Sequence, residues 1–78
     1  MQKIKLTWGF NGLDSLKTAQ HFNIHLEEFL ENEEILFHTT GLDSISDYHN
    51  IAFLVIDKQY IDKIKDTLKP QKAFLLED

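Results

Sequence analysis

Residues 3–10 alternate between polar and apolar positions. Lysine and threonine occupy one set of positions, and the other set is apolar, consisting of Ile4, Leu6, Trp8 and Phe10. Alternation with a period of two predicts a β-strand that buries one face. The glycine at position 9 and the Asn11-Gly12 pair predict the end of this strand.

Beyond Asn11 the spacing of the apolar residues changes to three and four, which predicts a helix that runs to about Glu31. Asn11, with Asp14 three residues later, imitates the start signal of a helix. The predicted core stripe consists of Leu16, Ala19, Phe22, Leu26, Phe29 and Leu30. Ile24 is the one large apolar residue on the other side of the helix.

The second half of the chain repeats this order of elements. The segments are a strand at 35–40, a hairpin connection at 41–47, a strand at 48–56, a helix from Asp57 to about Leu68, and a strand at 72–76. The strand at 48–56 is apolar on both faces, which is typical of a central strand. Pro70 requires the second helix to end just before it.

The predicted order is therefore βαββαβ, the α+β arrangement called ferredoxin-like, in a single domain over residues 1–78. Right-handed crossovers give a four-stranded antiparallel sheet of order 4-1-3-2 with both helices on one face. The other face stays open, and several apolar residues belong to it. We expect this open face to associate with a partner, most simply in a homodimer.

Composition narrows the function classes. The formal net charge is −5, from 13 acidic against 8 basic residues, and all the basic residues are lysines. An acidic surface without arginine disfavours nucleic acid and anionic membranes as partners. The chain has no cysteine, which excludes disulfides, thiolate catalysis and cysteine-ligated metals. No segment resembles a signal peptide or a membrane span, so a cytoplasmic location is expected.

The histidines of the first helix form the first candidate site. His21, His25 and Glu28 follow one another at intervals of four and three residues, so they project from one stripe of the helix. Imidazole nitrogens on neighbouring helical turns can bind one divalent transition-metal ion. The alternative is that these are ordinary surface histidines. No cofactor is required by the sequence, and such an ion is the only candidate cofactor.

The second candidate site lies at one end of the predicted sheet. The connection after the first strand and the predicted hairpin at 41–47 should meet there, beside the start of the first helix. The candidate ligand-binding residues are Trp8, Asn11, Asp43, Asp47 and His49. The alternative is plain turn chemistry, with Asp and Ser side chains capping backbone groups. Asp47 and His49 would also suit acid/base catalysis.

Three families share the predicted topology, and each comparison is made on residues. Residues 50–56, Asn-Ile-Ala-Phe-Leu-Val-Ile, loosely resemble the third-strand signature of RNA-recognition motifs but lack its basic residue and glycine. Acylphosphatases use an arginine that this chain does not contain. Residues 9–13 are similar in position to the glycine loop of ACT-type regulatory domains, which implies ligand binding at a subunit interface. The Asp-x-Pro-Gly motif of those domains is absent.

The sequence thus favours a small binding or regulatory module that associates through its open sheet face and takes a small ligand at the loop end or at a subunit interface. A histidine-based transition-metal-binding protein that uses the first helix is the alternative. A small enzyme that uses Asp47 and His49 is a weaker one, because the chain has neither a nucleophile motif nor a phosphate-binding loop.

Overall fold

The computed structural model describes residues 2–76 and has the predicted order of elements. The elements are β1 (Lys3–Asn11), α1 (Ser15–Asn32), β2 (Phe37–Ser46), β3 (His49–Asp57), the 3-10 turn η1 (Lys58–Tyr60), α2 (Ile61–Leu68) and β4 (Lys72–Leu76). The fold is α+β and ferredoxin-like, as the sequence predicts.

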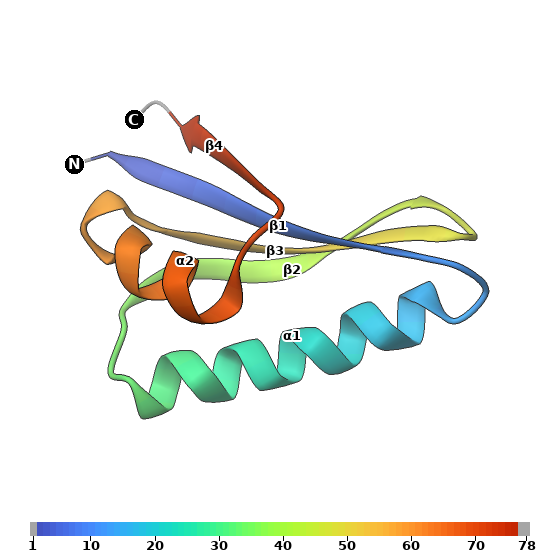
Figure 1. The fold of residues 1–78 in the computed structure, drawn as a ribbon, viewed down its shortest axis with the longest axis horizontal. Coiled ribbons are helices and arrows are strands. Elements are labelled where there is room, and N and C mark those ends of the chain that lie inside the picture. Colours follow the sequence, from blue (N-terminus) through green and yellow to red (C-terminus); the bar gives the residue numbers. More distant parts are fainter. Residues whose placement is uncertain (1, 77–78) are drawn as a thin grey trace.

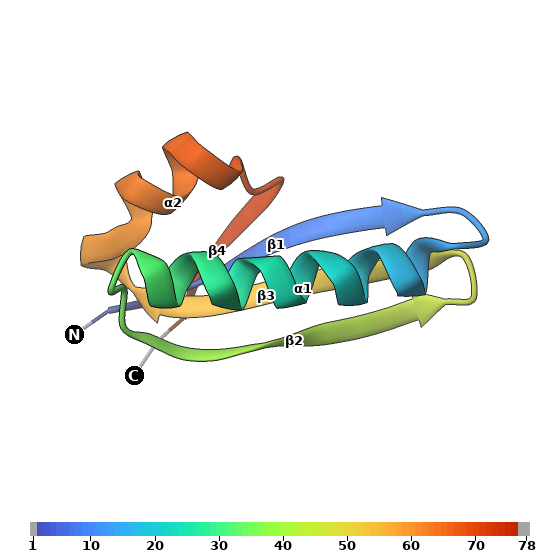
Figure 2. The ribbon, with the colours of Figure 1, turned by 90° about the horizontal axis from the view of Figure 1, so that it is seen from below.

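All neighbouring strands of the sheet are antiparallel, and their order is β2-β3-β1-β4. This is the predicted order 4-1-3-2 read from the other edge. Both helices lie on the same face of the sheet (Figure 1). Seen from the helical side, α1 runs along β3, while α2 lies beside the N-terminal half of β1 (Figure 2).

The core lies between the sheet and the two helices. Most buried residues of β1 and β3 lie at alternate positions, and Thr7 and Val55 are buried as well on the other face. Helix α1 contributes three residues of its predicted stripe, Ala19, Leu26 and Leu30. Phe22 and Phe29 pack partly buried against this core, whereas Leu16 is 45% exposed. Ile24 is 57% exposed, in agreement with its predicted place on the outer side of α1.

Strand β2 is longer than the sequence indicates. The predicted hairpin connection at 41–47 is wrong, because Phe37–Ser46 is one strand and only Asp47 and Tyr48 form the turn. The turn-forming residues stay in the strand because their backbones pair with β3: Asp43 lies opposite Ile51, and Ser44 lies opposite Asn50. Pairing along a strong central strand thus overrides the local preference of Asp and Ser for turns.

The open face of the sheet carries a lysine near its centre. Lys5 Nζ lies 4.6 Å from the centroid of the Phe53 ring and 3.3 Å from Asp43 Oδ2. Phe74 lies opposite Lys5 in the sheet and is 47% exposed. The open face is therefore mixed in polarity, with an apolar border at β4.

Within residues 2–76, neither helix is both long enough and apolar enough to cross a membrane.

Candidate functional site

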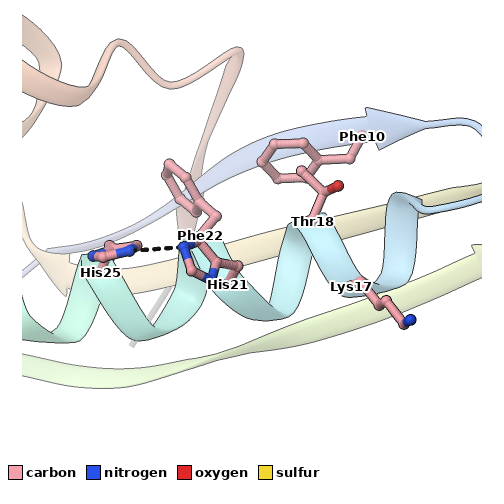
Figure 3. Close-up of a pocket in the computed structure, with 6 residues that line it drawn as sticks. All are labelled: Phe10, Lys17, Thr18, His21, Phe22 and His25. Atoms are coloured by element: carbon pink, nitrogen blue, oxygen red, sulfur yellow. Dashed lines mark hydrogen bonds between the residues drawn. The ribbon is translucent and has the colours of Figure 1, made fainter.

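His21 and His25 lie side by side on the outer surface of α1 (Figure 3). Their Nε2 atoms are 2.9 Å apart, and their ring centroids are 4.5 Å apart. The helix produces this contact, since residues four positions apart stand one above the other on the same face. When no metal ion is bound, the Nε2 atom of one histidine donates a hydrogen bond to the Nε2 atom of the other. Both histidines of the predicted metal site are thus brought together.

Glu28 contacts the other side of the same pair. Its Oε1 lies 3.2 Å from His25 Nδ1, the ring nitrogen that does not face His21. A carboxylate at Nδ1 favours a proton on that nitrogen and leaves the lone pair of Nε2 free. The structure therefore gives Glu28 the geometry of a residue that orients a ligand, where the sequence predicts a ligand.

The histidine pair borders a hollow of about 590 Å³ between α1 and β1. The hollow is lined by Phe10, Lys17, Thr18, His21, Phe22 and His25. Phe22 lies at its centre, with ring centroids 5.5 Å from Phe10 and 4.9 Å from the buried Trp8. The hollow thus combines an aromatic wall with two imidazole rings at its rim.

The short second helix explains why this surface is open. α2 ends at Leu68, whose carbonyl oxygen accepts a hydrogen bond of 2.9 Å from Trp8 Nε1. Beyond that point the helical face of β1 has no second helix over it (Figure 2). Phe10 at the end of β1 is therefore only partly buried, and Phe22 of α1 is its aromatic neighbour.

Within residues 2–76, no group of three or more His, Asp or Glu side chains is arranged to hold a metal ion. The two Nε2 atoms of the histidine pair, 2.9 Å apart, lie close enough together to share one ion. Any ion bound there keeps coordination positions for ligands from outside the chain.

The predicted loop-end site gathers only in part. Asn11 and His49 lie opposite each other at the ends of β1 and β3, and Asp47 is in the adjoining turn. Gly12 N donates a 2.8 Å hydrogen bond to Tyr48 O, which closes this end of the sheet. Across the described part of the chain, no hydrogen bond or ion pair joins Asp47 to His49.

The remaining two predicted residues of that site lie elsewhere. Asp43 is inside β2 and faces Lys5 on the open side of the sheet, because the segment predicted as a loop is a strand. Trp8 is buried on the helical side, against Phe22. Trp8 and Asp43 therefore stand on opposite faces of the sheet and do not share a site.

Sequence reasoning missed the contact between His38 and Asp57, whose Nε2 and Oδ1 atoms are 2.7 Å apart. His38 sits at an irregularity of the β2–β3 register, between Phe37 and Thr39. A bulge of this kind redirects a side chain, and no local sequence signal marks it. Asp57, which the sequence predicts to start a helix, makes no side-chain capping bond.

Neither a protein-family model, nor a curated protein, nor a solved structure matches the chain.

Proposed function

We propose that this protein is a small binding module that takes a divalent transition-metal ion on His21 and His25, together with a ligand in the adjoining hollow. The observation that carries the proposal is the 2.9 Å separation of the two Nε2 atoms. Imidazole nitrogen is a favoured ligand of zinc, copper and nickel ions.

The separation is close to what a shared ion requires. With metal–nitrogen distances of about 2.0–2.1 Å, two ligands of a tetrahedral ion lie about 3.3 Å apart. The two rings need to open by only a few tenths of an ångström from their 2.9 Å contact. Both side chains are on the exposed surface of α1, so this adjustment displaces no core residue.

Glu28 supports metal binding from behind His25. Its carboxylate at Nδ1 holds the ring in the tautomer whose Nε2 accepts a metal ion, and it makes that nitrogen a stronger ligand. A chain with His21 and His25 but without this carboxylate is therefore expected to bind the same ion more weakly.

The hollow suggests what completes the coordination. Two protein ligands leave two positions of a tetrahedral ion for water or for a bound molecule. The adjoining surface is aromatic, formed by Phe10 and Phe22. The ligand class that fits is a small molecule with a metal-binding nitrogen or oxygen next to an apolar ring.

Titration with Zn²⁺, Ni²⁺ and Cu²⁺ tests the proposal, with the imidazole C–H resonances of all four histidines followed by NMR. We expect the signals of His21 and His25 to shift or broaden first and together. His21→Ala and His25→Ala should each abolish the effect, whereas the control His49→Ala should leave it unchanged. Equal binding by the doubly substituted chain would contradict the proposal.

A second candidate function is association through the open sheet face. It is favoured by Phe74, which is 47% exposed beside Lys5 on that face. Light scattering of Phe74→Lys tests it, and the matched control is Leu75→Lys, because Leu75 is 59% exposed on the other face of the same strand. A dimer that survives Phe74→Lys would exclude the open face as its interface.

A further inference from the structure

Strand β2 is an edge strand that lacks most of the usual protection. It has register irregularities at 37–39 and 44–46 but pairs regularly between them. It pairs with β3 on one side only, and its ten residues include neither lysine nor proline. Its one charged residue, Asp43, is paired with Lys5 at 3.3 Å. The opposite edge, β4, has only five residues, starts at Lys72 and is preceded by Pro70. Lysine, proline and short length are the features that keep edge strands from pairing, so β2 is the edge open to a further strand.

The direction of the backbone groups along β2 follows from the pairing of β1 with β3. Gly12 N donates to Tyr48 O, one step beyond the Asn11–His49 pair, so that pair is of the non-hydrogen-bonded kind. Backbone groups alternate in direction along a strand, and the odd-numbered residues of β3 therefore bond to β2. The N–H and C=O groups of Thr40, Leu42 and Ser44 then point outward from the sheet.

Helix α1 presents a stripe of exposed residues on its outer surface, and the stripe reaches β2 at Glu27. The stripe has alternating spacings of three and four and consists of Lys17, Gln20, Ile24, Glu27 and Glu31. Glu27 fixes its position, since Glu27 Oε2 accepts a 2.6 Å hydrogen bond from Thr40 Oγ1 of β2. Lys17 projects from α1 away from Phe10 (Figure 3). This spacing is that of a seam between two helices.

We propose that two copies of the chain pair their β2 strands antiparallel across a two-fold axis near Leu42. The pairing forms one continuous sheet and brings the two α1 stripes together. This interface does not use the histidine pair. It shares Lys17 with the lining of the hollow, so Glu31→Lys, which lies outside the hollow, is the variant that separates dimerisation from ligand binding.

The stripe is complementary to itself under that symmetry. In an antiparallel helix pair centred on Ile24, residues equally far before and after it lie opposite each other. Lys17 and Glu31 are each seven positions from Ile24, so Lys17 of each copy faces Glu31 of the other. Gln20 of each copy falls beside Glu27 of the other, and the two Ile24 side chains meet. A two-fold interface requires this kind of self-complementary patch.

The centre of the stripe and the centre of the strand coincide. Starting from the Glu27–Thr40 contact, Ile24 lies three residues back along α1, a distance of about 4.5 Å. The same distance along β2, which runs antiparallel to α1, is between one and two residues at about 3.3 Å each. Measured along β2 from Thr40, this distance ends between Gly41 and Leu42, where the two-fold axis of the strand pairing is placed.

Charge reversal tests this geometry without touching the core. Lys17→Glu and Glu31→Lys should each raise the dimer dissociation constant about ten-fold, because each places like charges opposite each other twice in the dimer. The double variant should restore dimerisation. Within one copy Lys17 and Glu31 are about 21 Å apart along the helix, so rescue cannot arise inside the monomer. Sedimentation equilibrium measures all three, with Lys58→Glu as the control for net charge.

Cysteine cross-linking gives a second readout, because the chain has no cysteine of its own. Ile24→Cys should be cross-linked to a dimer by a short bismaleimide, and Phe74→Cys on the open face should not. Cross-linking of Phe74→Cys with none of Ile24→Cys would overturn the proposal, as would a chain that stays monomeric at millimolar concentration. Unchanged dimerisation in both charge-reversal variants would do the same.

Discussion

Asn50 and Ser15 form a buried hydrogen bond between the sheet and the first turn of α1, with Asn50 Nδ2 donating to Ser15 Oγ over 2.8 Å. Both residues are at most 2% exposed. The contact fixes where α1 starts on β3. Because helical geometry then determines every later residue of α1, this polar pair also sets the positions of His21 and His25 along the sheet.

Removal of the hydroxyl should be costly because it leaves a buried donor without its partner. Ser15→Ala is expected to lower the free energy of unfolding by about 1–3 kcal/mol. Urea denaturation measures this, and Thr67→Ala on the exposed side of α2 is the control, with an expected change within about 0.5 kcal/mol. Equal effects of the two substitutions would show that the Asn50–Ser15 bond contributes little.

The fold follows from the sequence because its strongest patterns are local. The alternation in β1, the three-four spacing in α1 and the apolar run in β3 each specify one element. These patterns do not show whether a polar segment pairs with a neighbouring strand. Asp43 and Ser44 read as turn residues, and only their register opposite Ile51 and Asn50 keeps them in β2.

The same limit applies to the candidate sites. The contact between His21 and His25 is predictable, since it needs only the helical repeat. The loop-end site is not predictable in this way, because the end of β2 determines which of its residues lie in a loop and which lie on a face of the sheet. The expected hairpin at 41–47 would bring Asp43 to the loop end, whereas the observed strand places Asp43 and Trp8 on opposite faces of the sheet. The His38–Asp57 contact depends on a bulge that only the structure reveals.

Gly41 and Phe53 should be energetically coupled across the β2–β3 pair. A Cβ atom at position 41 would lie 2.7 Å from Phe53 Cζ, so the ring occupies the space above the glycine. Gly41→Ala should therefore destabilise the protein by about 1–3 kcal/mol. In a Phe53→Leu background the cost should shrink by at least about 0.5 kcal/mol, because the smaller side chain gives way. Chemical denaturation of the parent chain and the three variants measures the coupling, and strict additivity would contradict it.

Gln71 extends the edge of the sheet with its side chain. Its Oε1 accepts a hydrogen bond from Gly9 N at 3.1 Å, and its Nε2 donates one to Gly9 O at 3.2 Å. Gln71→Ala should expose the Gly9 amide and speed its hydrogen exchange, while Gln71→Glu keeps the acceptor and should preserve most of the protection. Amide exchange followed by NMR distinguishes the variants. If the Gly9 amide exchanges equally fast in the parent chain and in both variants, its protection comes from the strand pairing alone.

Metal binding by the histidine pair should be visible as added stability that depends on pH. An ion that binds only the folded chain raises the free energy of unfolding, by about 2.7 kcal/mol at a free concentration one hundred times its dissociation constant. Protons compete with the metal ion for the same nitrogens, so the gain should be larger at pH 8 than at pH 5. Thermal unfolding with and without Ni²⁺ at the two pH values measures this.

Two variants locate the bound ion. In Glu28→Gln the gain in stability at pH 8 should be smaller but present, whereas in His25→Ala it should vanish. A gain that persists in His25→Ala would place the ion elsewhere on the chain.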